Sequence, residues 1–183
     1  MKRGLVSILL VAIPLALIPR LSTLAGNNTG AINITMTTVE TIIEITLDKT
    51  DWEIGNVTAD TEYKTDPEAT WCTINNTGTV KVDIGIKGEN AKDALSPTII
   101  WSLSNDGTNG ENKYALCYHL SGDTAGNYTP ITLNETPIKK SGKNVTIEVS
   151  GEKQFGLKLL TPEFFQYYDR NMETHVTISA VPT

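Results

Sequence analysis

Apolar and polar residues alternate along most of this chain, and this period of two is the feature that most constrains its fold. The clearest run is residues 80–87, where Val80, Val82, Ile84 and Ile86 are each followed by a Lys, an Asp or a Gly. Successive side chains of a β-strand point to opposite faces of the sheet, so such a run predicts a strand with one buried face. Further strands are predicted at residues 32–36, 43–47, 100–103, 114–120, 145–149, 155–159 and 176–180.

Turn residues separate these runs. Gly, Asn, Asp and Ser, which tolerate positive φ or favour turns, recur at residues 76–78, 105–110, 122–123 and 141–142. Short strands at regular spacing predict an all-β fold, an antiparallel two-sheet sandwich of the jelly-roll or immunoglobulin-like type. One short helical turn is expected at residues 161–168, because Thr161 can cap it and Pro162 suits its first position. Trp52, Trp71 and Trp101 are expected to anchor the core.

The first 25 residues have the pattern of a signal peptide. Lys2 and Arg3 precede an apolar run of 14 residues, which is shorter than the ~20 residues of a membrane-spanning helix. Small residues, Thr23 and Ala25, stand before the predicted cleavage site. An alternative is cleavage after Gly4, as in archaeal type IV prepilins, although prolines interrupt the apolar run. We therefore expect a secreted protein, extracellular or on the cell surface, with a signal peptide at 1–25, an extension at 26–40 and a β-domain at 41–183.

Seven of the fourteen asparagines stand in the tripeptide Asn-x-Thr, which is the acceptor for N-linked glycan. Random placement of the chain's 35 serine and threonine residues would give fewer. The alternative is that Thr-rich strands and Asn-rich turns produce these tripeptides by composition. The sequence predicts N-linked glycans on Asn27, Asn33, Asn56, Asn75, Asn127, Asn134 and Asn144.

The charge of the chain argues against a nucleic-acid partner. Without residues 1–25 the chain has 12 basic and 21 acidic residues, a formal net charge of −9. No basic stripe is present to neutralise phosphates. No other segment is apolar enough to cross a membrane, so we expect no membrane partner after processing.

Cys72 and Cys117 are the only cysteines. In an exported protein an even pair predicts one disulfide, here between two sheets, and two buried free thiols are the alternative. Together with His119 and His175 they lack the ligand spacing of a zinc site. We expect no metal and no cofactor.

Residues that could carry catalysis are sparse. Cys117 and His119 would share one face of a strand, but no third group that could orient the histidine is identifiable. The acidic residues are scattered, and residues 105–111 lack the alternating acids of an EF-hand loop. We expect no enzyme; a secreted hydrolase with paired carboxylates on a β scaffold is kept as an alternative.

Two stretches carry a resemblance to a known group of proteins. Residues 52–63 (WEIGNVTADTEY) and 73–84 (TINNTGTVKVDI) have a strand, a Gly/Asp turn, a strand and an Asn-Thr-Gly hairpin. This pattern resembles the secreted prokaryotic β-sandwich subunits that include the biofilm-fibre protein TasA, the camelysins and the archaeal bundling pilins. The resemblance implies a jelly-roll-like sandwich and a filament in which the N-terminal strand of one subunit completes the sheet of the next.

The extension offers a candidate for such a strand. Residues 26–30 (GNNTG) are flexible in composition, and residues 31–39 place Ile32, Ile34 and Met36 on one face. A free strand beside an open sheet edge adds to it by backbone hydrogen bonds, and head-to-tail addition gives a filament. The alternative is that this strand pairs within its own domain.

The expected function is therefore a structural subunit of an extracellular filament or surface layer. Its partners would be identical subunits in a homopolymer, each carrying N-linked glycan. The first alternative is a monomeric binding or adhesion module, for which Tyr118, Tyr128, Tyr167 and Tyr168 could supply an aromatic patch. The second is the secreted hydrolase.

Overall fold

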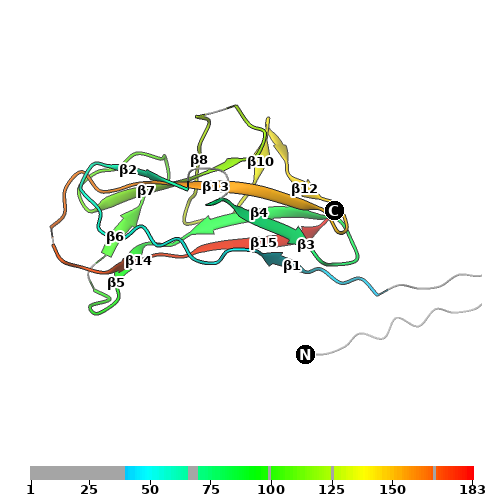
Figure 1. The fold of residues 1–183 in the computed structure, drawn as a ribbon, viewed down its shortest axis with the longest axis horizontal. Helices are drawn as coiled ribbons and strands as arrows, with labels where there is room; N and C mark the ends of the chain where they lie inside the picture. The colour runs from blue at the N-terminus through cyan, green and yellow to red at the C-terminus, as the bar shows by residue number, and fades with distance from the viewer. Residues whose placement is uncertain (1–39, 66–69, 99, 125, 167) are drawn as a thin grey trace, which may run out of the picture. The chain divides into compact units, whose positions relative to one another are not determined.

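The computed structural model describes residues 40–65, 70–98, 100–124, 126–166 and 168–183. These residues belong to one compact unit, Thr38–Thr183. It is all-β: fifteen strands and no α-helix are found in the described residues (Figure 1). The predicted signal peptide and the predicted strand at 31–39 lie outside the described residues, together with Ile32, Ile34, Met36, Asn27 and Asn33.

A nine-stranded mixed sheet is the larger layer of the fold. Its main path is β1 (Ile45–Leu47), β3 (Cys72–Asn76), β13 (Glu152–Leu160), β7 (Lys113–Leu120), β6 (Ile100–Leu103), β5 (Ala91–Asp93) and β14 (Met172–Glu173). Two short strands join it, β2 (Glu62–Lys64) on β13 and β8 (Thr129–Pro130) on β7.

One strand pair in this sheet differs from the expected antiparallel arrangement. β6 and β7 are parallel, with Ser102 opposite Lys113 and Leu103 opposite Tyr114. The expectation was wrong here: residues 104–112 do not form a hairpin but return the chain so that β7 starts beside β6 and runs in the same direction.

A four-stranded sheet is the smaller layer. β4 (Val82–Gly88) pairs with β15 (Val176–Pro182) on one side and with β9 (Thr136–Pro137) and β12 (Thr146–Ile147) on the other. β10 (Lys139–Lys140) and β11 (Lys143–Asn144) form a separate hairpin.

The two sheets share one hydrophobic core. Val82, Ile84 and Ile86 of β4 are at most 1% exposed, as their alternation with polar residues predicts. They belong to the same cluster as Tyr114 and Leu120 of β7. Trp101 also lies in this core, and Trp52 packs against it half-buried.

Strand β7 is buried on both faces, which the sequence pattern did not predict. Its outer face presents Cys117 and His119, and the ring of Trp71 lies edge-on 5.4 Å from the ring of His119. Gly156 allows this approach, because a Cβ there would lie 2.7 Å from the Trp71 ring. Trp71 is therefore buried as expected, but on the outer face of the sheet and outside the central core.

The predicted helical turn at 161–168 is wrong for the described residues. Thr161 is fully buried, and its hydroxyl donates to Thr58 O (2.7 Å) and accepts from Thr61 N (2.9 Å). Asp60 N donates to Pro162 O at 2.8 Å. Hydrogen bonds to a segment 100 residues away have replaced the local cap.

The predicted disulfide is also wrong. Both cysteines are free thiols, and both lie in the larger sheet, with β13 between them. Cys72 is opposite Phe155 and Cys117 is opposite Lys158. Strands lie about 4.8 Å apart, so the two Cα atoms are separated by two strand spacings, beyond the ~7 Å limit for a disulfide.

Candidate strand-addition edge

Strand β15 is a long edge strand. It pairs with β4 over seven residues, from Val176 opposite Gly88 to Pro182 opposite Val82. No other strand of the described residues pairs with its second side. Figure 1 shows β15, in red, lying along β4, in green.

The hydrogen-bond pattern determines which backbone groups of β15 face outward. Thr183 N donates to Lys81 O (3.3 Å), in register with the β15–β4 ladder. The backbone N–H and C=O groups of successive residues point alternately to the two sides of an antiparallel strand. The backbone groups of the odd-numbered residues of β15 therefore point toward β4. On the far side of β4, Ile84 N donates to Val145 O at 3.2 Å, which confirms this alternation.

The even-numbered residues of β15 consequently direct their backbone groups out of the sheet. Ile178 and Ala180 each present an N–H and a C=O at the free edge. Pro182 has the same parity and lacks an N–H, and such positions on edge strands are where proline is tolerated. The edge can thus form a further ladder with an extended segment.

The core is incompletely covered beside this edge. Val176, Ile178 and Ala180 of β15 pack against the core but are only half-buried. Ile45 and Leu47 of β1, the terminal strand of the larger sheet, also pack against the core and are half-buried. An added strand would remove apolar surface of these residues from water.

The segment that precedes β1 is fixed to the turn between β3 and β4. Ile42 N donates to Thr79 Oγ1 (2.9 Å), Thr79 N donates to Ile42 O (2.9 Å), and Thr79 Oγ1 donates to Glu40 O (2.8 Å). Thr77 N and Gly78 N both donate to Glu44 O, at 3.0 and 3.1 Å. Residues 40–44 are therefore held at the end of the domain where β15 finishes and β4 begins.

Four of the five predicted glycosylation asparagines in the described residues are exposed: Asn56, Asn127, Asn134 and Asn144. Asn75 is half-buried in β3, between β1 and β13. Glycosylation stays a prediction at all seven positions. Because Asn75 is half-buried, it is the least accessible of the five.

The residues considered for catalysis or ligand binding are not gathered in an accessible site. Cys117 and His119 do share one face, but both are buried, and His119 Nδ1 lies 2.7 Å from Asn127 O. Burial raises the pKa of the Cys117 thiol, which disfavours the nucleophilic thiolate. Tyr118 is 2% exposed, and Tyr128 is half-buried with Lys158 Nζ 4.7 Å from its ring centre. Tyr168 is exposed, and Tyr167 lies outside the described residues.

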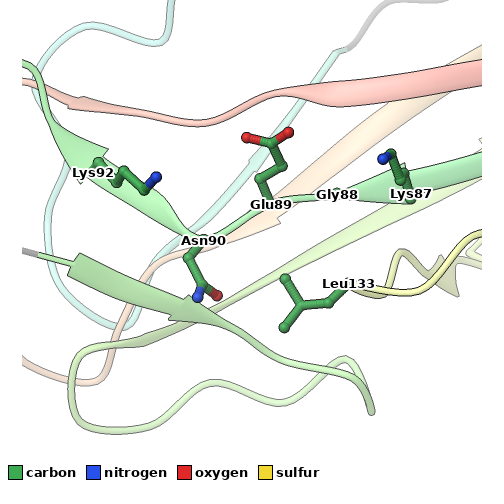
Figure 2. Close-up of a pocket in the computed structure, with 6 residues that line it drawn as sticks. All are labelled: Lys87, Gly88, Glu89, Asn90, Lys92 and Leu133. Carbon is green, nitrogen blue, oxygen red and sulfur yellow. The ribbon is translucent and has the colours of Figure 1, made fainter. Parts of the chain in front are cut away.

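A hollow of about 290 Å³ lies where β4 leads into β5 (Figure 2). It is lined by Lys87, Glu89 and Lys92, and no Ser, Thr, Cys or His of the described residues lines it. Figure 2 shows Asn90 pointing away from Glu89, and its Oδ1 accepts a hydrogen bond from Leu103 N at 2.9 Å. Across the described residues, no three His, Cys, Asp or Glu side chains are grouped as metal ligands, and no helix is long and apolar enough to span a membrane.

No protein-family model matches the chain, and no curated protein is significantly similar to it. The candidate site therefore rests on geometry. Sequence reasoning predicted a strand at residues 176–180 but not its place at an edge, for which Pro182 was the available signal.

Proposed function

We propose that this chain is a secreted structural subunit of an extracellular filament, in which the N-terminal strand of one subunit adds to the β15 edge of the next. The observation that carries the proposal is this seven-residue edge, unpaired among the described residues, with half-buried apolar side chains facing the core. Two sheets around one core fit a jelly-roll-like sandwich. The resemblance to TasA, the camelysins and the bundling pilins supports the same assembly.

The sequence before β1 favours donation to a neighbour over pairing within the same domain. Residues 40–44 lie at the end of the domain next to Pro182, and β1 runs from there into the domain. To reach its own β15, the preceding segment would have to reverse direction sharply. Residues 34–45 (ITMTTVETIIEI) contain no Gly, Pro, Asn or Asp, the residues on which tight turns depend. A segment of nine residues reaches about 30 Å when extended, which is enough to lie along a strand of a neighbouring subunit.

The apolar face of the donated strand matches what the edge leaves uncovered. Ile32, Ile34 and Met36 recur with period two, as do Val176, Ile178 and Ala180 on the edge strand. Backbone hydrogen bonds to the outward groups of Ile178 and Ala180 would supply affinity, and the apolar side chains would extend the core. Each subunit both donates and accepts, so the contact does not close and a filament grows.

The signal-peptide pattern and the Asn-x-Thr tripeptides support an assembly outside the cell. The subunit is N-glycosylated at exposed asparagines, and its partners are identical subunits. The net charge of −9 after processing suits an extracellular surface that must not adhere to anionic polymers.

A proline at the free edge tests the proposal. Ala180→Pro removes one outward N–H and leaves the β4 ladder intact, because proline is accepted where the N–H faces away from the sheet. We expect folded subunits that fail to polymerise, measured by sedimentation and electron microscopy. Thr177→Ala, on the exposed outer face of the same strand, is the matched control and should assemble like the unmodified chain.

Filaments of normal length from a folded Ala180→Pro chain would reject the β15 edge as the acceptor. Circular dichroism and the unfolding midpoint establish folding in the same samples. Ser179→Pro removes an N–H that faces β4, so it should lower the unfolding midpoint and distinguish a damaged sheet from a blocked edge.

A further inference from the structure

A second hollow lies on the outer face of the smaller sheet, and Asn144 stands at its rim. Its volume is about 320 Å³, at the lower end of the range of about 300–1,000 Å³ for ligand clefts, which suits a single sugar ring. The residues that matter to the argument are Asp83, Gly85, Glu135, Asn144, Val181 and Pro182.

We propose that this hollow seats the first sugar of a glycan on Asn144. The inference rests on the glycosylation included in the proposed function and does not depend on filament formation. It distinguishes Asn144 from the other exposed acceptor asparagines, none of which lines this hollow.

The Asn144 side chain is held in a fixed orientation by Asp83. Asn144 Nδ2 donates to Asp83 Oδ2 (3.1 Å), and Thr146 Oγ1 donates to Asp83 Oδ1 (2.5 Å). These two bonds, of which the one from Thr146 has the larger effect, hold the pKa of Asp83 below its usual value. The Asp83 carboxylate is therefore charged at neutral pH. An asparagine amide has two N–H groups. A glycosidic bond replaces one, and the other continues to donate to Asp83, which directs the sugar along the rim.

The walls of the hollow offer both parts of a sugar-binding surface. Val181 is 54% exposed and, with Pro182, provides an apolar wall for the C–H face of a sugar ring. Glu135 also lines the hollow: its Oε1 accepts a hydrogen bond from Ser179 Oγ, and the carboxylate retains acceptor capacity for sugar hydroxyls.

Gly85 leaves room for the Ser179–Glu135 pair at the floor of the hollow. A Cβ at this position would lie 2.5 Å from Ser179 Oγ and 2.6 Å from Glu135 Oε1. Any larger residue would displace the pair that forms the polar wall.

The attachment step belongs to the unfolded chain. The Thr146 hydroxyl, which the acceptor tripeptide must present, is bonded to Asp83 in the folded domain. In the transfer, the C1–O bond of a lipid-phosphate-linked sugar breaks and a bond from Asn144 Nδ2 to C1 forms. One Nδ2 proton is released to a base of the transferase, and the lipid phosphate leaves. Folding then brings the attached sugar against Val181.

The test compares the full chain with Thr146→Val and Thr146→Ser, all produced in a host that N-glycosylates Asn-x-Thr. Thr146→Val keeps the side-chain shape but removes the acceptor tripeptide, whereas Thr146→Ser retains both tripeptide and hydroxyl. Mass spectrometry of the peptide 144–153 reports the modification. Hydroxyl-radical footprinting, on samples in the same assembly state, reports the exposure of Val181. Val149, which is 48% exposed and does not line the hollow, is the internal control.

We expect a glycan adduct on Asn144 in the unsubstituted and Thr146→Ser chains. Oxidation of Val181 should be severalfold slower in these chains than in Thr146→Val, while oxidation of Val149 is unchanged. If Thr146→Val folds poorly, Asn144→Gln takes its place, because it also lacks the acceptor. Val181 should then be oxidised as fast in Asn144→Gln as is expected for a folded Thr146→Val chain. An unmodified peptide, or a glycan that leaves Val181 oxidation unaltered, would overturn the inference. Filament formation, scored by electron microscopy in the same samples, reports on the proposed function separately.

Discussion

Asn76, at the end of β3, joins the two sheets through its side chain. Its Nδ2 donates to Val80 O (2.8 Å) and to Ile147 O and Glu148 O (both 3.1 Å), and its Oδ1 accepts from Gly78 N (3.0 Å). The side chain is 1% exposed, so these carbonyls have little access to water if the amide is removed.

Asn76→Ala should therefore lower the free energy of unfolding by about 2–3 kcal/mol, the cost of leaving buried polar partners unsatisfied. Urea unfolding of unglycosylated protein measures this loss. Asn75→Ala, at the half-buried neighbouring position, should cost less than about 1 kcal/mol. Equal losses for the two variants would show that the Asn76 amide does not tie the sheets together.

Asp48 makes stability depend on pH in the acidic range. Thr73 N donates to Asp48 Oδ1 at 2.6 Å, and this backbone hydrogen bond, opposed by desolvation, lowers the pKa of Asp48 from its ordinary 3.8. A carboxyl with a lowered folded pKa stabilises the fold fully above its unfolded pKa. That contribution is lost as the pH falls below 3.8 and through the folded pKa.

Unfolding free energies measured at several pH values between 6 and 2 should therefore decrease below about pH 4. The decrease should be shallower in Asp48→Asn, which cannot titrate but keeps an acceptor for Thr73 N. Because Asp83 and Glu62 have lowered pKa values as well, some decrease remains in the variant. Identical slopes for the two proteins would contradict the role of Asp48.

At the scale of elements, the Thr77–Thr79 turn fixes the position of residues 40–44, which precede β1. Gly78 is required there, because a Cβ would collide with Ile42 O and Glu44 N. The turn and residues 40–44 act as one unit, because Thr77, Gly78 and Thr79 each form hydrogen bonds with residues 40–44.

Thr79→Val keeps the shape of the side chain and removes the hydroxyl that bonds Ile42 N and Glu40 O. Amide exchange of Ile42 should accelerate markedly, while the amides of β7 stay protected, because local opening needs far less free energy than global unfolding. Thr77→Val, at an exposed position in the same turn, is the control. Unchanged exchange at Ile42 would mean that residues 40–44 are held by other contacts.

Several elements could be predicted from sequence because their burial is local. The sequence pattern of residues 80–87 predicts a strand, because one face of this strand packs in the core and the other face is more exposed. β7 could not be read in this way, because Trp71 covers its second face from another part of the chain. The helical turn failed for the same kind of reason: Thr161 bonds residues 58 and 61.

The candidate site was predicted less fully than the strands. A pair of cysteines carries no information on strand order, so the disulfide between Cys72 and Cys117 could not be excluded before β13 was found between them. In the same way, residues 176–180 read as a strand, but only the ladder with β4 identifies β15 as an edge. The donor residues Ile32, Ile34 and Met36 remain a sequence prediction.

At the scale of the whole molecule, the proposed assembly needs one donor strand and one acceptor edge per subunit. Replacing Ile32, Ile34 and Met36 with Asp places charges where the donated strand meets the core of its neighbour. We expect soluble, folded monomers, detected by size-exclusion chromatography, because unpaired charges are strongly disfavoured in an apolar groove. Thr35→Asp with Thr37→Asp changes the opposite face of the same strand and should still polymerise. Filaments from the apolar-face variant would remove the donor role from these residues.

The most direct test of the central claim is a cryo-electron microscopy map of the native extracellular material. The account predicts filaments in which residues 31–39 of one subunit form a strand against Ile178 and Ala180 of the next. A map in which β15 is bare, or is paired with the N-terminal segment of its own subunit, would contradict it.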